Sequence, residues 1–145
     1  MKAIIFDFNR TVYDPEKDEL FDGIIMLMEK AKEAGFSLYL VAKGGEERQM
    51  KIKSLDLPKY FRKIIVRPEK TRAEFEDIMK EAEPETAFFV LGDRTRKEIR
   101  FGNECKMTTI WFKNGKFAEE TPTEKVEEPD YTIELLEEAM DILRI

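Results

Sequence analysis

Short apolar segments alternate with amphipathic segments along almost the whole chain, and this alternation limits the fold more than any other feature. The apolar segments are rich in β-branched and aromatic side chains and are too short to be helices, so they predict buried strands. They comprise residues 3–8, 38–41, 64–66, 87–91, 108–112 and 131–133. The segments between them include residues 20–34, 46–55, 71–82 and 134–143, where helices are predicted. Strands alternating with helices predict right-handed βαβ units, and hence a doubly wound α/β fold whose parallel sheet is covered on both faces.

Size and charge narrow the class of protein. A chain of 145 residues, 42% of them hydrophobic, predicts one domain that spans residues 1–145. The net charge is −6, so no global basic field favours a nucleic-acid partner. No apolar run approaches the roughly 18 residues of a membrane span, and the N-terminus becomes acidic too early for a signal peptide. We therefore expect no nucleic-acid or membrane partner.

Two residue types are scarce, and their scarcity excludes several chemistries. The chain contains no histidine, which rules out histidine metal sites, Ser-His-Asp triads and Cys-His dyads. Its one cysteine, Cys105, cannot form an internal disulfide, which favours a reducing, cytoplasmic location. Glutamate and lysine are abundant while asparagine and glutamine are few, a tendency of proteins from hyperthermophiles.

Polar residues follow the predicted strands. In a doubly wound fold, ligands bind beyond the carboxyl ends of the strands, near the point where the strand order reverses. The residues expected at this edge are Asp7 and Asn9 after the first strand, Ala42, Lys43, Gly44 and Gly45 after the second, Lys70 before a helix, and Asp93 and Glu98 after the fourth strand. Carboxylates suit a hard cation such as Mg²⁺, and a lysine with turn amides suits a phosphate group. An aspartate with its charge compensated is a credible nucleophile toward phosphorus.

Taken singly, each of these residues has a structural explanation. Asp7 could be a cap, Lys70 a solvated surface lysine, and the two pairs Gly44-Gly45 and Gly92-Asp93 ordinary turns. The functional interpretation depends on their order and spacing together.

That order resembles the haloacid dehalogenase (HAD) superfamily of phosphohydrolases over nearly the whole chain. Asp7-x-Asn9-x-Thr11 resembles the first motif of the family, DxDxT, and the segment from Gly92 to Ile99 resembles the fourth, GDxxxx(D/E)I. Lys70 stands where the third motif supplies a lysine, and Ala42 stands at the serine or threonine of the second.

The resemblance implies a role for each position. Asp7 would be the nucleophile that forms a phosphoaspartyl intermediate. Mg²⁺ would be held by the Asp7 carboxylate, the Asn9 main-chain carbonyl and Asp93, with support from Glu98. Lys70 would clamp nucleophile and phosphate, and the backbone after Val41, from Ala42 and Lys43 onward, would bind phosphate oxygens.

The chain departs from the family pattern at two positions. The second aspartate of the first motif, the general acid and base of family phosphatases, is Asn9, which cannot transfer a proton at neutral pH. General acid–base catalysis typically contributes about 10²–10⁴ in rate, so slow turnover is expected. Ala42 lacks the hydroxyl of the second motif, and one hydrogen bond to a charged group is worth roughly 1.5–3 kcal/mol.

The intervals from Tyr13 to Phe36 and from Lys43 to Lys70 have no room for a cap domain. An open site suits a large phosphorylated substrate or a partner subunit, such as a second copy of the chain, that covers it. The alternative function is a catalytically degenerate HAD-fold binding or regulatory protein. A phosphoacceptor receiver domain is disfavoured, because the third predicted strand ends in Val66-Arg67-Pro68 and offers no acceptor aspartate.

Overall fold

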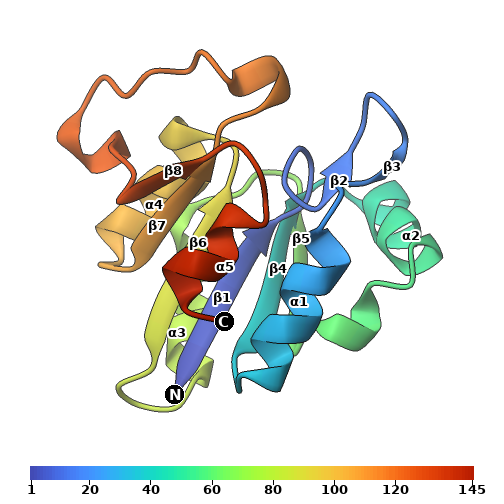
Figure 1. Cartoon of the computed structure of the whole chain (residues 1–145), viewed down its shortest axis with the longest axis horizontal. Coiled ribbons are helices and arrows are strands. Elements are labelled where there is room, and N and C mark those ends of the chain that lie inside the picture. Colours follow the sequence, from blue (N-terminus) through green and yellow to red (C-terminus); the bar gives the residue numbers. More distant parts are fainter.

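The computed structural model describes all 145 residues. Six parallel strands form one sheet in the order β5-β4-β1-β6-β7-β8 (Figure 1). Their bounds are β1 (Lys2–Asp7), β4 (Ser37–Lys43), β5 (Lys63–Arg67), β6 (Ala87–Gly92), β7 (Thr108–Phe112) and β8 (Tyr131–Ile133). All six strands were predicted from the apolar segments, and the doubly wound α/β fold is confirmed.

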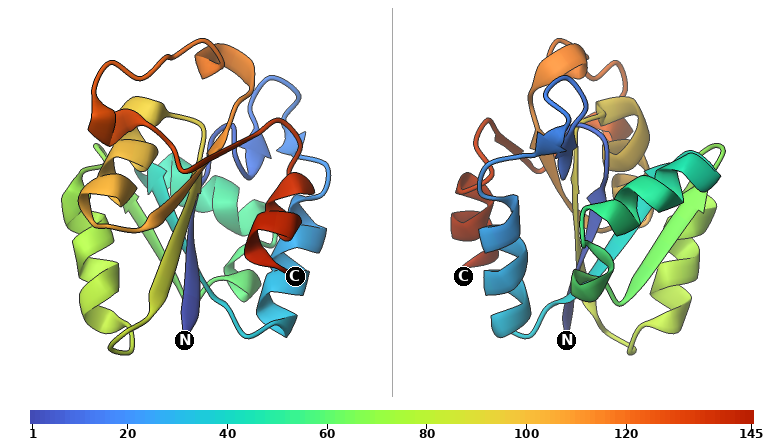
Figure 2. Two further views of the ribbon diagram at one scale, coloured as in Figure 1. Left: turned by 60° about the vertical axis from the view of Figure 1, so that its left-hand side comes forward. Right: turned by 90° about the vertical axis from the view of Figure 1, so that its right-hand side faces the viewer.

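The helices cover both faces of the sheet (Figure 2). On one face lie α1 (Ile24–Glu33), α2 (Glu46–Ser54) and α5 (Glu138–Leu143), which contribute to the larger apolar core cluster. On the other lie α3 (Arg72–Glu81) and α4 (Arg100–Glu104), which pack on the smaller cluster. The two clusters take alternate residues of β1, such as Ile4 and Ile5, because successive strand side chains point to opposite faces.

Three local features differ from the sequence prediction. A two-stranded hairpin, β2 (Tyr13–Asp14) and β3 (Glu19–Leu20), precedes α1, so that helix begins later than predicted, after Gly23 in a left-handed conformation. The last helix is shorter than predicted and begins at Glu138; residues 134–137 form a bend and a turn before it, where the amides of Glu134 and Leu135 donate hydrogen bonds to the Glu138 side chain. The residues after β6 form a single turn of π-helix, η2 (Thr95–Ile99), ahead of α4.

The segment of residues 113–130, here called the strap, runs across the carboxyl edge of the sheet, where the hairpin also lies (Figures 1 and 2). It contains two short 3₁₀ turns, η3 (Gly115–Phe117) and η4 (Lys125–Glu127). Asn114 fixes its start by donating hydrogen bonds to the carbonyls of Arg10 and Phe112, at 2.8 and 3.0 Å. No cap domain interrupts the chain between β1 and β4 or between β4 and α3, as predicted. None of the helices combines the length and the apolar composition needed to span a bilayer.

Candidate active site

The strand order reverses between β1 and β6, and the acidic residues follow these two neighbouring strands. Asp7 is the last residue of β1, and Asp93 comes directly after β6. Because adjacent parallel strands end at the same edge, the two carboxylates are brought together at the position where doubly wound folds bind ligands.

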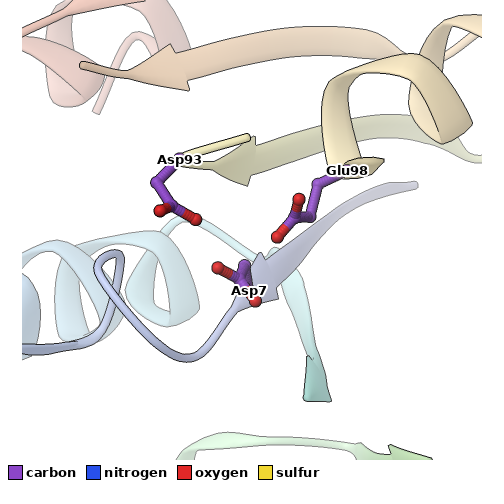
Figure 3. Close-up of side chains that lie close together, drawn as sticks. All are labelled: Asp7, Asp93 and Glu98. Carbon is purple, nitrogen blue, oxygen red and sulfur yellow. The ribbon is translucent and has the colours of Figure 1, made fainter. Parts of the chain in front are cut away.

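Glu98 completes an acidic cluster with Asp7 and Asp93, and the three side chains point toward one another (Figure 3). One oxygen of each carboxylate lies within 4.8 Å of the others, and all three residues are at most 4% exposed. Glu98 reaches the cluster from η2. A Cβ on Gly92 would lie only 2.8 Å from the Glu98 Cβ, so the close approach of this turn requires glycine at position 92.

Lys70 lies between two members of the cluster. Its Nζ is 2.5 Å from Asp7 Oδ1 and 2.7 Å from Glu98 Oε1, and its side chain is 9% exposed. Lys70 stands just before Thr71, which caps α3 through a capping box with Glu74. This cap fixes where the helix begins and therefore where Lys70 meets the edge of the sheet.

The buried charges shift one another's pKa values. Burial raises the pKa of Asp93 to about 10 and that of Glu98 to about 7, and in both the negative charge of Asp7 adds to the effect. Burial is the largest influence on the pKa of Asp7 and by itself would raise it. The positive charge of Lys70 and the hydrogen bonds from Asp93, Lys70 and Glu98 together outweigh burial, so the pKa of Asp7 is lowered. Asp7 is therefore ionised at neutral pH and keeps the electron pair that a nucleophile needs.

The acidic cluster fits a divalent cation. Three buried carboxylates face a single ammonium, and Glu98 Oε2 is buried without any hydrogen-bond partner. An unpartnered buried carboxylate oxygen is costly, and a hard cation with oxygen ligands would satisfy it. Asp7, Asp93 and Glu98 are thus a set of residues that could hold Mg²⁺.

A cavity of about 200 Å³ opens over this cluster. Of the residues predicted from the sequence, Asp7, Asn9, Lys43, Lys70, Asp93 and Glu98 line it. Ala42 does not: it is completely buried and belongs to the larger core cluster. The Gly44 amide donates to the Arg67 carbonyl at 2.8 Å, so this turn amide is already engaged.

The prediction from sequence missed the basic and aromatic residues of the cavity wall: Arg10, Arg48, Arg94, Lys97, Lys116 and Phe117. Arg10 stands inside the first motif in a left-handed conformation (φ 61°), and Lys97 directly precedes Glu98, so their positions could have been noticed. Arg48 lies on a mostly polar helix, and its sequence carries no comparable signal.

Comparison with known proteins agrees with this geometry. A family model described as HAD-hydrolase-like matches residues 67–139, which is just over half of the chain. The chain therefore belongs to the HAD-hydrolase-like family.

One sequence relative and two solved structures illustrate the similarity. The glyceraldehyde 3-phosphate phosphatase of Methanopyrus kandleri is 28% identical over 132 residues, which cover 86% of this chain and 56% of that protein. This chain thus spans little more than half the length of that relative. A HAD phosphatase from Thermococcus onnurineus has a TM-score of 0.76 at 19% identity, covering 99% of this chain and 98% of that one. The D,D-heptose 1,7-bisphosphate phosphatase of B. bronchiseptica, solved with magnesium and phosphate, has a TM-score of 0.77 at 13% identity, covering 99% and 98%.

Proposed function

We propose that this protein is a Mg²⁺-dependent phosphohydrolase that acts through a phosphoaspartyl intermediate on Asp7. The observation that carries the proposal is the position of the Asp7 carboxylate. It ends the strand beside the reversal of strand order, lines the cavity and lies 2.5 Å from the Lys70 ammonium. An ionised carboxylate at that position can attack the phosphorus of a substrate that enters the cavity.

Asp7, Asp93 and Glu98, with the main-chain carbonyl of Asn9, would hold the Mg²⁺. When bound, the ion would supply positive charge beside the phosphoryl oxygens, where negative charge accumulates during transfer. Lys70 would orient Asp7 and neutralise part of the same charge. Lys43, which lines the cavity with a side chain 62% exposed, would attract the phosphate.

The first half-reaction forms a bond between an Asp7 oxygen and phosphorus and breaks the bond between phosphorus and the leaving oxygen. An alkoxide leaving group needs a proton at this point, and Asn9 has none to give. Its Oδ1 instead accepts a hydrogen bond from the Arg48 guanidinium, at 3.2 Å. In the second half-reaction water attacks the phosphoaspartate, again without a base at position 9. We therefore propose slow turnover, with aryl and acyl phosphates favoured over alkyl phosphates.

One observation favours a second candidate function, that of a binding or regulatory protein. Asn9 and Ala42 together remove the proton-transfer group and the hydroxyl of the family motifs, whereas the cation-binding cluster and Lys70 are retained. Such a chain would bind Mg²⁺ and a phosphorylated ligand, or a partner, without turning it over.

The two functions are separated by trapping the intermediate. The protein is incubated with phenyl phosphate and Mg²⁺, quenched in acid and analysed by intact mass and peptide mapping. We expect a phosphoryl adduct on Asp7, none in Asp7→Asn, and the wild-type level in the control Asp77→Asn, which changes an exposed aspartate of α3. If neither the wild type nor Asn9→Asp forms an adduct or releases phenol, the binding function is the better description.

A further inference from the structure

The wall of the cavity is basic, although the chain as a whole carries an excess of acidic residues. Six cationic side chains line the cavity in addition to Lys70. Three of them have carboxylate partners: Arg10 pairs with Glu16 at 3.2 Å, Lys43 with Glu69 at 3.3 Å and Arg94 with Glu120 at 2.8 Å.

The other three, Arg48, Lys97 and Lys116, form no salt bridge. They come from α2, η2 and η3, elements that are far apart in the sequence and meet only at this cavity. Three unpaired cations at one opening, in a chain of net charge −6, form a site that attracts anions.

Arg48 is held in place by its surroundings. Its guanidinium lies over the Phe8 ring, 4.9 Å from the centroid, and donates to Asn9 Oδ1 at 3.2 Å and to the Lys43 carbonyl at 3.3 Å. The stem passes over Gly44, where a Cβ would lie 2.6 Å from the Arg48 Cβ. These contacts use two of the guanidinium nitrogens, so the planar group is oriented and still has N–H donors for a ligand.

Lys116 is positioned by the strap. It adjoins Phe117, whose ring also lies under the Arg94 guanidinium at 3.8 Å, and Asn114 ties this turn to the loop after β1. Lys97 is carried by the same π-helical turn that presents Glu98 to the acidic cluster. The three cations therefore line the same cavity from three separate elements.

We propose that the substrate is a small phosphate monoester with a second anionic group, and that Arg48, Lys97 and Lys116 bind this second group. The inference rests on the proposed phosphohydrolase function and specifies its substrate class. The phosphoryl group that is transferred would lie over the acidic cluster, where Lys70 and the Mg²⁺ held by the carboxylates would neutralise its charge. Arg48, Lys97 and Lys116 are then left without an anionic partner. A carboxylate or a second phosphate at the other end of the substrate would supply it.

The size of the cavity restricts the substrate further. Pockets for drug-sized ligands usually occupy about 300–1,000 Å³, and this cavity, at about 200 Å³, is smaller. Because both anionic groups must contact residues that line this cavity, we expect them to be separated by only a few bonds, while the rest of a larger substrate could extend out of the open site.

Binding of non-hydrolysable phosphonates tests the proposal independently of catalysis. Propylphosphonate carries one anionic group, and 3-phosphonopropionate has the same length with a terminal carboxylate. Titration calorimetry of the whole chain in Mg²⁺ buffer should show 3-phosphonopropionate binding about tenfold or more tightly than propylphosphonate. Ethylene-1,2-diphosphonate, measured in the same way, tells whether a carboxylate or a second phosphate is the preferred group.

The variants Arg48→Met, Lys97→Met and Lys116→Met remove each charge while retaining an unbranched stem. We expect each to reduce the preference for 3-phosphonopropionate, and the triple variant to bring the ratio of the two dissociation constants close to one. Lys80→Met is the matched control, because it removes one exposed charge from α3 away from the cavity, and it should keep the wild-type ratio. Circular dichroism melting verifies that all variants are folded.

Equal affinity of the wild type for the two phosphonates would overturn the proposal and leave the phosphohydrolase function standing. A wild-type preference that survives in the triple variant would overturn it as well, because other residues would then recognise the second group. If neither phosphonate binds, the proposed substrate class is wrong, and trapping of the phosphoryl adduct on Asp7 decides the phosphohydrolase function separately.

Discussion

Mg²⁺ should stabilise this protein by an amount that grows with pH, and the acidic cluster provides the reason. In the absence of the ion, the folded-state pKa of Glu98 is about 7 and that of Asp93 about 10, both above their usual values, because burial and the Asp7 charge penalise ionisation. A raised carboxyl pKa means that the folded state holds a proton that the unfolded state has already released. The free energy of unfolding must therefore fall as the pH rises through this interval.

The size of the effect follows from the shift of Glu98. For Glu98 alone, a change from 4.5 to about 7 corresponds to about 3 kcal/mol of stability lost between roughly pH 4.5 and pH 8, at 1.36 kcal/mol per pH unit. The raised pKa of Asp93 adds a loss of the same sign over this interval, so the value for Glu98 is a lower bound. For a chain of this length, 1 kcal/mol changes the Tm by about 2–4 °C, so the metal-free Tm should drop over that range by at least the roughly 6–12 °C that Glu98 contributes. The chain has no histidine, so no imidazole titrates in the same interval.

A bound cation favours the ionised carboxylates and removes this penalty. The increase in Tm on adding Mg²⁺ should consequently be larger at pH 8 than at pH 5.5, and a concentration 100 times the Kd should add about 2.7 kcal/mol. Differential scanning calorimetry with EDTA or with Mg²⁺ at both pH values measures it. Asp93→Asn should lose most of the Mg²⁺ effect, whereas Asp77→Asn should retain it.

Two results would refute this reasoning. One is a Mg²⁺ effect of the same size at both pH values, which would mean that Glu98 and Asp93 do not face the ion. The other is an equal response of the wild type and Asp93→Asn, which would place the ion elsewhere.

Three further outcomes are expected. Asn9→Asp should raise the steady-state rate of alkyl phosphate hydrolysis by up to about 10²–10⁴ and weaken the dependence of the rate on the leaving group. A variant as inert as its parent toward both alkyl and aryl phosphates would contradict this. Ala42→Thr should lower the Tm and leave the calorimetric phosphate affinity unchanged, because position 42 is buried in the core and does not line the cavity. A gain in affinity approaching the roughly 1.5–3 kcal/mol of one hydrogen bond to a charged group would contradict this. Gly92→Ala should lower the Tm and reduce the Mg²⁺ effect, because the added Cβ would lie 2.8 Å from the Glu98 Cβ. Overpacking of this kind typically costs about 1–3 kcal/mol. Gly45→Ala is the control, because a Cβ at position 45 would have no atom within 4 Å.

The candidate site could be predicted from the sequence only in part. Asp7, Lys70, Asp93 and Glu98 were predicted from their order after strands and at the start of a helix, and the structure brings them together. Strand ends can be located in this way because apolar segments and turn residues mark them. Side chains on polar helices and surface turns have no such marker, and for this reason Arg48 and Lys116 were missed.

The sequence by itself determined the six strands, most of the helices and the parallel pairing of the strands, because hydrophobic periodicity is a local property and βαβ units imply parallel strands. The order of the strands in the sheet came from the structure. Only the tertiary structure decided which charges meet. Lys70 and Asp7 are separated by 63 residues, and Arg48 and Asn9 by 39. The pKa values of the acidic cluster depend on this proximity and on burial, neither of which a linear pattern contains. Only the tertiary structure also shows that three cations of the cavity are unpaired, because a salt-bridge partner can come from any part of the chain.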